Sequence, residues 1–219
     1  MACGTLSLIK RHRGGIKVTD RNRRYINTLL IFLLGLLLGI FSKWLDDIAL
    51  DSAIWGHGII ESLDLGNFFS DMAIWLLLAL VIALKSSSDK RAAFNVFVFF
   101  AGMCVSYHLY SVIVSGFNPF SYMMIWYGIT LLSPLAGWIC HYSRKKGTLT
   151  LIADALILSV FLLSCFSIGF FYCDIRGVLY LAVYAGALAV LYERPGQLLC
   201  SLLLSIPLAF LINPIWPFH

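Results

Sequence analysis

Ionisable side chains inside long apolar stretches are the residues of this sequence with the clearest capacity for chemistry. Asp154 interrupts TLTLIADALILSV, and His108 lies within CVSYHLYS. A charge at the centre of a bilayer costs about 2.5–3.5 kcal/mol on insertion scales, so such groups normally face the interior of a helix bundle. Together with Glu61, these residues are the candidate acid–base groups of an intramembrane enzyme that acts on lipid. The alternative is that Asp154 reaches headgroup water and His108 hydrogen-bonds a neighbouring helix.

The catalytic hypothesis is the weaker one because its residues lie far apart. A helical rise of about 1.5 Å per residue puts Asp154 and His108 toward opposite leaflets. The sequence also lacks HExxH, GxSxG, a glycine-rich phosphate loop and EF-hand spacing. We therefore assign no catalytic residue and expect no cofactor.

The cysteines and histidines show no metal-binding pattern. His57 and Glu61 are the closest ligand pair, but the flanking Gly56 and Gly58 disfavour the regular helix that would align them. The cysteines have no CxxC spacing and lie mostly in apolar runs, as small buried side chains do. They are Cys3, Cys104, Cys140, Cys165, Cys173 and Cys200. We expect no metal site.

A second group of residues, mostly aromatic, favours ligand binding. Its members are Trp55, Tyr107, His108, Tyr110 and Trp126. Tyr107, His108 and Tyr110 lie close together in the outer half of one apolar run. Trp126 is expected at matching depth after a short turn. Pockets for small ligands combine aromatic walls with few polar groups. These residues predict a site for a small, largely apolar ligand, to be bound or transported, unless they form an interfacial aromatic belt.

The elements that must position these residues are membrane-spanning helices. The chain is 60% hydrophobic and 12% charged, with a mean hydropathy of +0.88. Soluble domains are about 45–50% apolar and about 25% charged. The apolar runs are continuous rather than alternating, which favours helices over a β-barrel. An all-α, polytopic helical bundle is therefore predicted, with no room for a soluble catalytic domain.

About seven spans are expected, with six as the alternative. They cover 25–44, 67–84, 92–115, 120–140, 149–171, 177–192 and 198–215. The sixth is short, so the last two are alternatively a single helical hairpin broken at 193–196. The expected organisation is a basic N-terminal segment at 1–24, one transmembrane domain at 25–215 with an external loop at 45–66, and a short external C-terminus at 216–219.

The basic residues predict the orientation of the chain. Their three substantial clusters, within 10–24, 85–91 and 144–146, all fall on one alternating side. Cytoplasmic loops carry the excess of Lys and Arg, so the N-terminus is expected inside and the C-terminus outside. The net charge of +5 is thus mainly a topology signal and predicts no nucleic-acid partner. We expect a multi-pass protein of the plasma membrane, in bacteria the cytoplasmic membrane, surrounded by lipid.

Small and polar residues within the spans predict helix packing. Gly35 and Gly39 form one small-residue face, and Ala182 and Gly186 form another. Asn95 is a polar residue at helical spacing inside its span. Packing within the chain, a second copy and a membrane-protein partner all remain open. A structural or regulatory subunit of a membrane complex is accordingly the third functional hypothesis.

Two stretches carry a resemblance to known proteins. LLGLLLGIFSKWLDD and SDMAIWLLLALVIALKSSSDKRAAFNVFVFFAGMCVSYHLYS resemble a widespread, uncharacterised family of small polytopic membrane proteins from Gram-positive bacteria. That resemblance covers most of the chain and implies no function. In architecture alone, the small-residue first helix and long first external loop are similar to the substrate-binding S-components of vitamin transporters. Those usually have six spans, and no ligand-specific motif matches.

Overall fold

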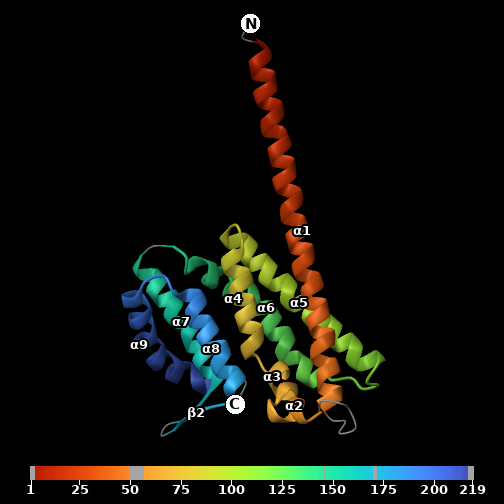
Figure 1. The fold of residues 1–219 in the computed structure, drawn as a ribbon, viewed down its shortest axis with the longest axis vertical. Coiled ribbons are helices and arrows are strands. Elements are labelled where there is room, and N and C mark those ends of the chain that lie inside the picture. Colours follow the sequence, from red (N-terminus) through yellow and green to blue (C-terminus); the bar gives the residue numbers. More distant parts are fainter. Residues whose placement is uncertain (1–2, 50–56, 146, 170–171, 217–219) are drawn as a thin grey trace.

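The computed structural model describes residues 3–49, 57–145, 147–169 and 172–216, and helices dominate them (Figure 1). The helices are α1 (Cys3–Ala49), α2 (His57–Ser62), α3 (Leu65–Ser70), α4 (Ala73–Lys85), α5 (Asp89–Ile113), α6 (Phe120–Tyr142), α7 (Thr148–Cys165), α8 (Val178–Leu191) and α9 (Pro195–Ile212). A 3-10 turn, η1 (Asn213–Ile215), follows α9. Strands β1 (Phe166–Ile168) and β2 (Cys173–Ile175) form a small antiparallel ribbon. The predicted helical bundle is confirmed.

The helices form two packing groups that share α4 as a common wall. On one side α1 and α6 pack against α5, and on the other α8 and α9 pack against α7 (Figure 1). Trp75 and Ala79 of α4 belong to the apolar core with α5 and α6. Leu80 and Leu84 belong to the core with α7 and α8. Because its opposite faces enter different cores, α4 joins the two groups.

The predicted span at 67–84 is wrong as a single helix, because the chain breaks between α3 and α4. Asp71 adopts an extended backbone with φ −88° and ψ 170°. Its carboxylate accepts a hydrogen bond from the Met72 N–H and another from the Arg176 guanidinium. Bonds from the next residue and from a distant segment therefore hold the break in place.

The predicted span at 149–171 is also too long. The helix α7 ends at Cys165, and Phe166 continues in extended backbone to pair with Ile175 across the ribbon. By contrast, α8 and α9 are two separate helices divided at the predicted break. Arg194 is extended, and Pro195 takes the first helical position, where its missing N–H is not needed. Both helices make their main contacts with α7 rather than with each other.

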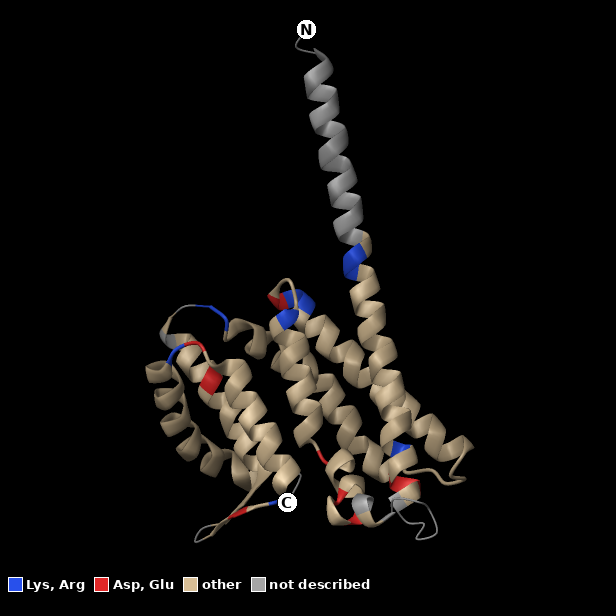
Figure 2. Cartoon of the chain, viewed as in Figure 1, with Lys and Arg blue, Asp and Glu red and all other residues tan. Residues whose placement is uncertain are grey.

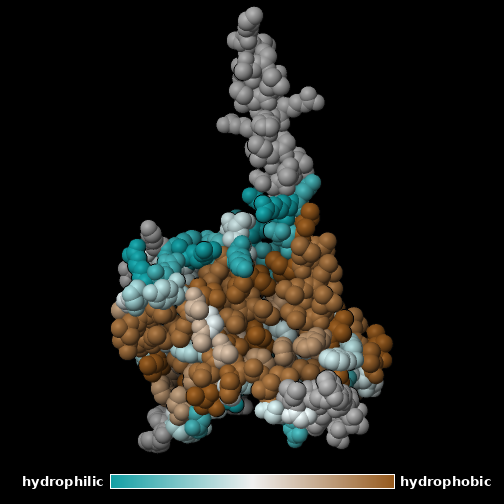
Figure 3. Space-filling view, in the orientation of Figure 1, coloured by the Kyte–Doolittle hydropathy of each residue, from teal (hydrophilic) through white to brown (hydrophobic). Residues whose placement is uncertain are grey.

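The surface and the helix lengths are those of a membrane protein. Four helical segments are long and apolar enough to cross a membrane: Asn22–Ile48, Asp89–Ile113, Phe120–Tyr142 and Pro195–Ile215. Shorter apolar helices cover Ala73–Lys85, Leu149–Cys165 and Val178–Leu191. Figure 3 shows an apolar band across the middle of the face in view. Many large hydrophobic side chains are exposed in the structure, Leu132 by 67%.

Charged residues gather at the two ends of the bundle (Figure 2). We call the end with Arg24, Lys85, Arg91 and Lys145 the basic end. The opposite, acidic end carries Asp46, Asp47, Asp64, Asp71 and Asp174. Helix α1 is continuous from Cys3 through the predicted N-terminal segment and extends beyond the bundle at the basic end. The apolar band lies between the two charged ends.

Candidate functional site

Polar side chains at the acidic end converge on Asp46 of α1. The Tyr107 hydroxyl of α5 donates to Asp46 Oδ2 at 2.8 Å, and the Ser70 hydroxyl of α3 donates to Asp46 Oδ1. A single carboxylate thus connects three helices. Hydrogen bonds to charged groups are stronger than neutral ones, so Asp46 is well suited to fix the position of α3 over the bundle.

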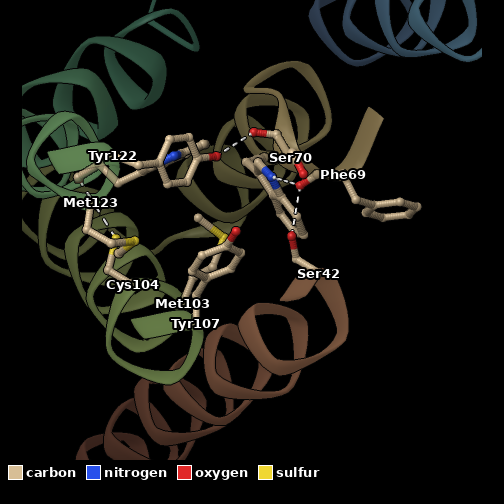
Figure 4. Close-up of a pocket in the computed structure, with 10 residues that line it drawn as sticks. Ser42, Phe69, Ser70, Met103, Cys104, Tyr107, Tyr122 and Met123 are labelled. Carbon is tan, nitrogen blue, oxygen red and sulfur yellow. Dashed lines mark hydrogen bonds between the residues drawn. The ribbon is translucent and has the colours of Figure 1, made fainter. Parts of the chain in front are cut away.

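A small cavity is lined by Ser70 and Tyr107, the two hydroxyl partners of Asp46 (Figure 4). Trp75 Nε1 and the Ser42 hydroxyl both donate to the Phe69 carbonyl at 3.0 Å, which fixes one wall. The Tyr122 hydroxyl donates to the Ser70 carbonyl at 3.0 Å. The cavity volume is about 20 Å³. A water molecule needs about 10–15 Å³, so this space suits about one water and is too small for an organic ligand.

The residues predicted to contact a ligand do not share one cavity in the described parts of the chain. Tyr107 and Trp126 line the small cavity. His108 lies apart from it, with Nδ1 hydrogen-bonded to the Tyr127 hydroxyl and Nε2 to Asn118 Oδ1 at 3.0 Å. Tyr110 is half-buried and is not among the residues that line this cavity. Trp55 lies outside the described residues.

A half-buried ion pair near the acidic end, in which Lys43 is the buried partner, was not predicted. Lys43 is only 5% exposed, and its Nζ lies 2.6 Å from Asp47 Oδ1 one helical turn later. The Ser115 hydroxyl donates to Asp47 Oδ2 at 2.7 Å. A buried charge is tolerated when it is paired and hydrogen-bonded, and this one is both. The sequence did contain a signal for this pair, because Lys43 and Asp47 are four residues apart and such residues share a helix face.

Asp154 is 4% exposed, as its predicted burial among other helices requires. Its carboxylate accepts hydrogen bonds from the Ser143 hydroxyl at the end of α6 and from Gln197 Nε2 of α9, the latter at 2.8 Å. Asp154 therefore fastens three helices together at the basic end. His108 lies toward the other end, in the last turns of α5, so the two candidate acid–base residues are well separated (Figure 1). Glu61 is exposed and belongs to α2.

Asn95 belongs to a second polar network at the basic end. The Thr28 hydroxyl of α1 donates to Asn95 Oδ1 at 2.9 Å, and Asn95 Nδ2 donates to the Ser86 hydroxyl at 3.0 Å. Asn95 is only 7% exposed. Its amide thus links α1, α5 and the turn after α4, which is the packing role expected of an amide inside a helix bundle.

The glycines of α1 face α5 of the same chain. A Cβ at Gly35 would lie 2.3 Å from the Phe99 carbonyl oxygen, and one at Gly39 would lie 2.2 Å from Ser106 Oγ. The two backbones therefore approach as closely as glycine permits. The second predicted packing face consists of Ala182 and Gly186. Gly186 approaches Leu77 of α4, whereas Ala182 is exposed. A partner subunit that binds α1 must accordingly use a face other than the glycine face.

An apolar cavity of about 430 Å³ separates the two helix groups. We call it the α6–α7 cleft, because these neighbouring helices line its two sides and make few direct contacts. Residues of α4, α5, α6, α7 and the α9–η1 end line it, among them Leu76, Phe100, Ala136, Ile157 and Trp216. Among the described lining residues, Ser133 alone carries a hydroxyl, which donates to the Thr130 carbonyl at 2.8 Å. The cleft therefore offers almost entirely apolar surface.

These contacts and the apolar band define a helical integral membrane protein. No family model, curated protein or solved structure matches the chain. Within the described residues, no group of three His, Cys, Asp or Glu side chains is placed to hold a metal ion.

Proposed function

We propose that this multi-pass membrane protein binds one long apolar chain, such as a lipid acyl or isoprenoid chain, in the α6–α7 cleft. The observation that carries the proposal is a cavity of about 430 Å³ with apolar walls. Ligand pockets typically measure about 300–1,000 Å³. The Ser133 hydroxyl already has a backbone acceptor, and apart from Cys140 and Trp216 the other described lining side chains carry no polar atom. The walls therefore match a ligand that is largely apolar. In this proposal the apolar ligand lies between the helix groups, whereas the sequence pattern predicted it beneath the 45–66 segment.

The position of the cleft supports entry from the bilayer. Leu132 and Ile215 both line it, and they are 67% and 80% exposed. The cleft is therefore continuous with the apolar surface band that we assign to the membrane. An empty apolar void also forfeits the dispersion contacts of its lining atoms. A hydrocarbon chain restores those contacts without leaving the hydrocarbon phase.

Seven crossings and a cytoplasmic N-terminus complete the proposal. The short helices α4, α7 and α8 pack among the longer ones, and irregular backbone at membrane depth is tolerated where it is buried in protein. The basic end is assigned to the cytoplasm because inner loops carry the Lys and Arg excess. The Gram-positive resemblance supports the bacterial cytoplasmic membrane as the location.

Cysteine labelling in intact cells tests this orientation. The native cysteines, including the exposed Cys173, are first replaced by serine. In that background, a single cysteine introduced at Gly58, in the acidic-end segment, should react with a membrane-impermeant maleimide added from outside. A cysteine introduced at Ser87, in the turn between α4 and α5, should react only after the cells are opened. The reverse pattern would overturn the orientation, since every basic cluster would then lie outside.

Native mass spectrometry of the full chain, released from mild detergent, tests the cleft as a binding site. The Ala136→Trp variant places a bulky ring in the cleft, whereas Ala185→Trp places the same ring on an exposed position of α8 outside it. The wild type and Ala185→Trp should retain a bound lipid-sized mass, and Ala136→Trp should lose at least nine-tenths of it. Absence of any adduct in the wild type, or equal retention by both variants, contradicts the proposal.

A further inference from the structure

A second large cavity opens at the basic end, on a different side of α4 from the α6–α7 cleft. Its volume is about 480 Å³. It is lined by the α1 stretch around Thr28, by Val81 and Ile82 of α4, by the turn that follows, and by the first turns of α5. The α4 residues that line the cleft, such as Leu76, are different ones. The two cavities are therefore independent of each other.

Four cationic side chains line this cavity: Arg23, Arg24, Lys85 and Arg91. No acidic residue is among its described lining residues. Asp89, the nearest acid to Lys85 and Arg91 in the sequence, is turned toward the α6–α7 connection, where its Oδ2 lies 2.6 Å from Lys145 Nζ. Within the described parts of the chain, none of the four cations has a carboxylate partner. Like charges held together repel one another, so the cavity favours an anion.

The cavity also has a fixed polar wall, which distinguishes it from loose surface charge. Arg91 Nη1 donates to the Thr28 hydroxyl at 3.3 Å, and its guanidinium lies 5.7 Å from the centroid of the Tyr25 ring. Asn95, hydrogen-bonded to Thr28 and Ser86, forms the deeper polar part of the wall. These contacts hold one guanidinium in place at the entrance to a polar recess between α1 and α5.

We propose that this cavity binds a phosphate-bearing anion. A guanidinium presents paired N–H donors that match phosphate oxygens, and basic recesses between membrane helices are suited to phospholipid headgroups. Leu30, Ile31, Val81 and Ile82 line the same cavity and offer apolar surface beside the cations. The shared chemistry is phosphate, which comes either from a membrane phospholipid headgroup or from a soluble phosphate compound.

Binding measurements on the full-length protein in a neutral detergent separate the two sources. Phosphatidylglycerol and phosphatidylcholine are titrated by native mass spectrometry, and inorganic phosphate and glycerol phosphate by calorimetry. Saturable binding of phosphatidylglycerol, at least ten-fold tighter than phosphatidylcholine, identifies a lipid headgroup site. Saturable binding of the soluble phosphates alone identifies a soluble ligand. If none of the four probes binds saturably, the proposal is overturned.

Charge-matched variants separate the cavity from the general surface potential. Arg91→Gln removes a cation that lines the cavity, and Lys90→Gln removes its exposed neighbour that does not. Arg91→Gln should weaken binding at least ten-fold, and Lys90→Gln less than two-fold. Arg24→Gln, at an exposed lining position, provides a second test should Arg91→Gln fail to fold. Equal losses of binding affinity in the lining variants and in Lys90→Gln would overturn the proposal.

Discussion

The α1–α5 contact and the α6–α7 cleft show two opposite ways in which neighbouring helices meet in this protein. Between α1 and α5, Gly35, Gly39 and Gly102 bring backbone against backbone. Between α6 and α7, side chains such as Leu132 and Ile157 surround a void of about 430 Å³. In a membrane, close packing is a principal force that joins helices. The first contact therefore holds α1 against α5 unaided, whereas we expect the second to be complete only when something fills it.

Substitution of Gly39 by Ala should have the largest effect on stability, because the added methyl group clashes within the closely packed contact between α1 and α5. The added Cβ would lie 2.2 Å from Ser106 Oγ and 2.4 Å from the Met103 carbonyl oxygen. Overpacking typically costs about 1–3 kcal/mol, and backbone against backbone leaves little room to relax. We expect a loss of about 2–3 kcal/mol in the free energy of unfolding, measured by denaturation in detergent micelles.

Gly128→Ala is the matched control for that experiment. Gly128 lies in α6, and a Cβ there meets no atom within 4 Å. Alanine is the better helix former, so this variant should be neutral or gain up to about 1 kcal/mol. Equal stability of the two variants would show that α1 and α5 are not in backbone contact.

Asp154→Leu should have the next largest effect, because it releases the basic end of α6, α7 and α9. The substitution leaves the Ser143 hydroxyl and the Gln197 amide without their carboxylate acceptor. An unsatisfied buried polar group costs about 1–3 kcal/mol, and we expect a thermal destabilisation of that size.

Asp154→Asn keeps the shape and one carbonyl acceptor, so it should cost less than Asp154→Leu in the same thermal measurement. The comparison between the two variants separates loss of the charge from loss of the hydrogen bonds. Wild-type stability of both would mean that Asp154 does not fasten these helices.

Ala136→Trp should have the smallest effect on stability, although it adds the largest side chain. Its ring enters the α6–α7 cleft, where volume is available. We expect a change of less than about 1 kcal/mol in the free energy of unfolding, because filling a cavity restores dispersion contacts. A loss as large as that of Gly39→Ala would show that α6 and α7 already pack closely.

Much of the fold could be predicted from the sequence because long apolar runs predict membrane-spanning helices. The glycine face of α1 was likewise visible, since small residues four apart indicate close approach. The break at Asp71 was not visible, because it depends on Arg176, which lies 105 residues away. Gln197, the partner of Asp154, is similarly distant at 43 residues.

The cleft itself could not be predicted for a different reason. The apolar residues that line a void are of the same types as those that fill a core, so their sequence pattern is identical. Only the distance between α6 and α7 distinguishes the two cases. The separation of His108 from the small cavity that Trp126 lines has a related reason. Residue spacing put His108 and Trp126 at similar depth but did not fix the direction of either side chain.

An experimental structure of the wild-type protein in lipid nanodiscs tests the central claim most directly. We expect elongated density in the α6–α7 cleft, in contact with Leu132, Ile157 and Trp216 and surrounded almost entirely by apolar side chains. Density for α6 packed directly against α7, with no space between them, would contradict it. So would an open cleft that holds no continuous density.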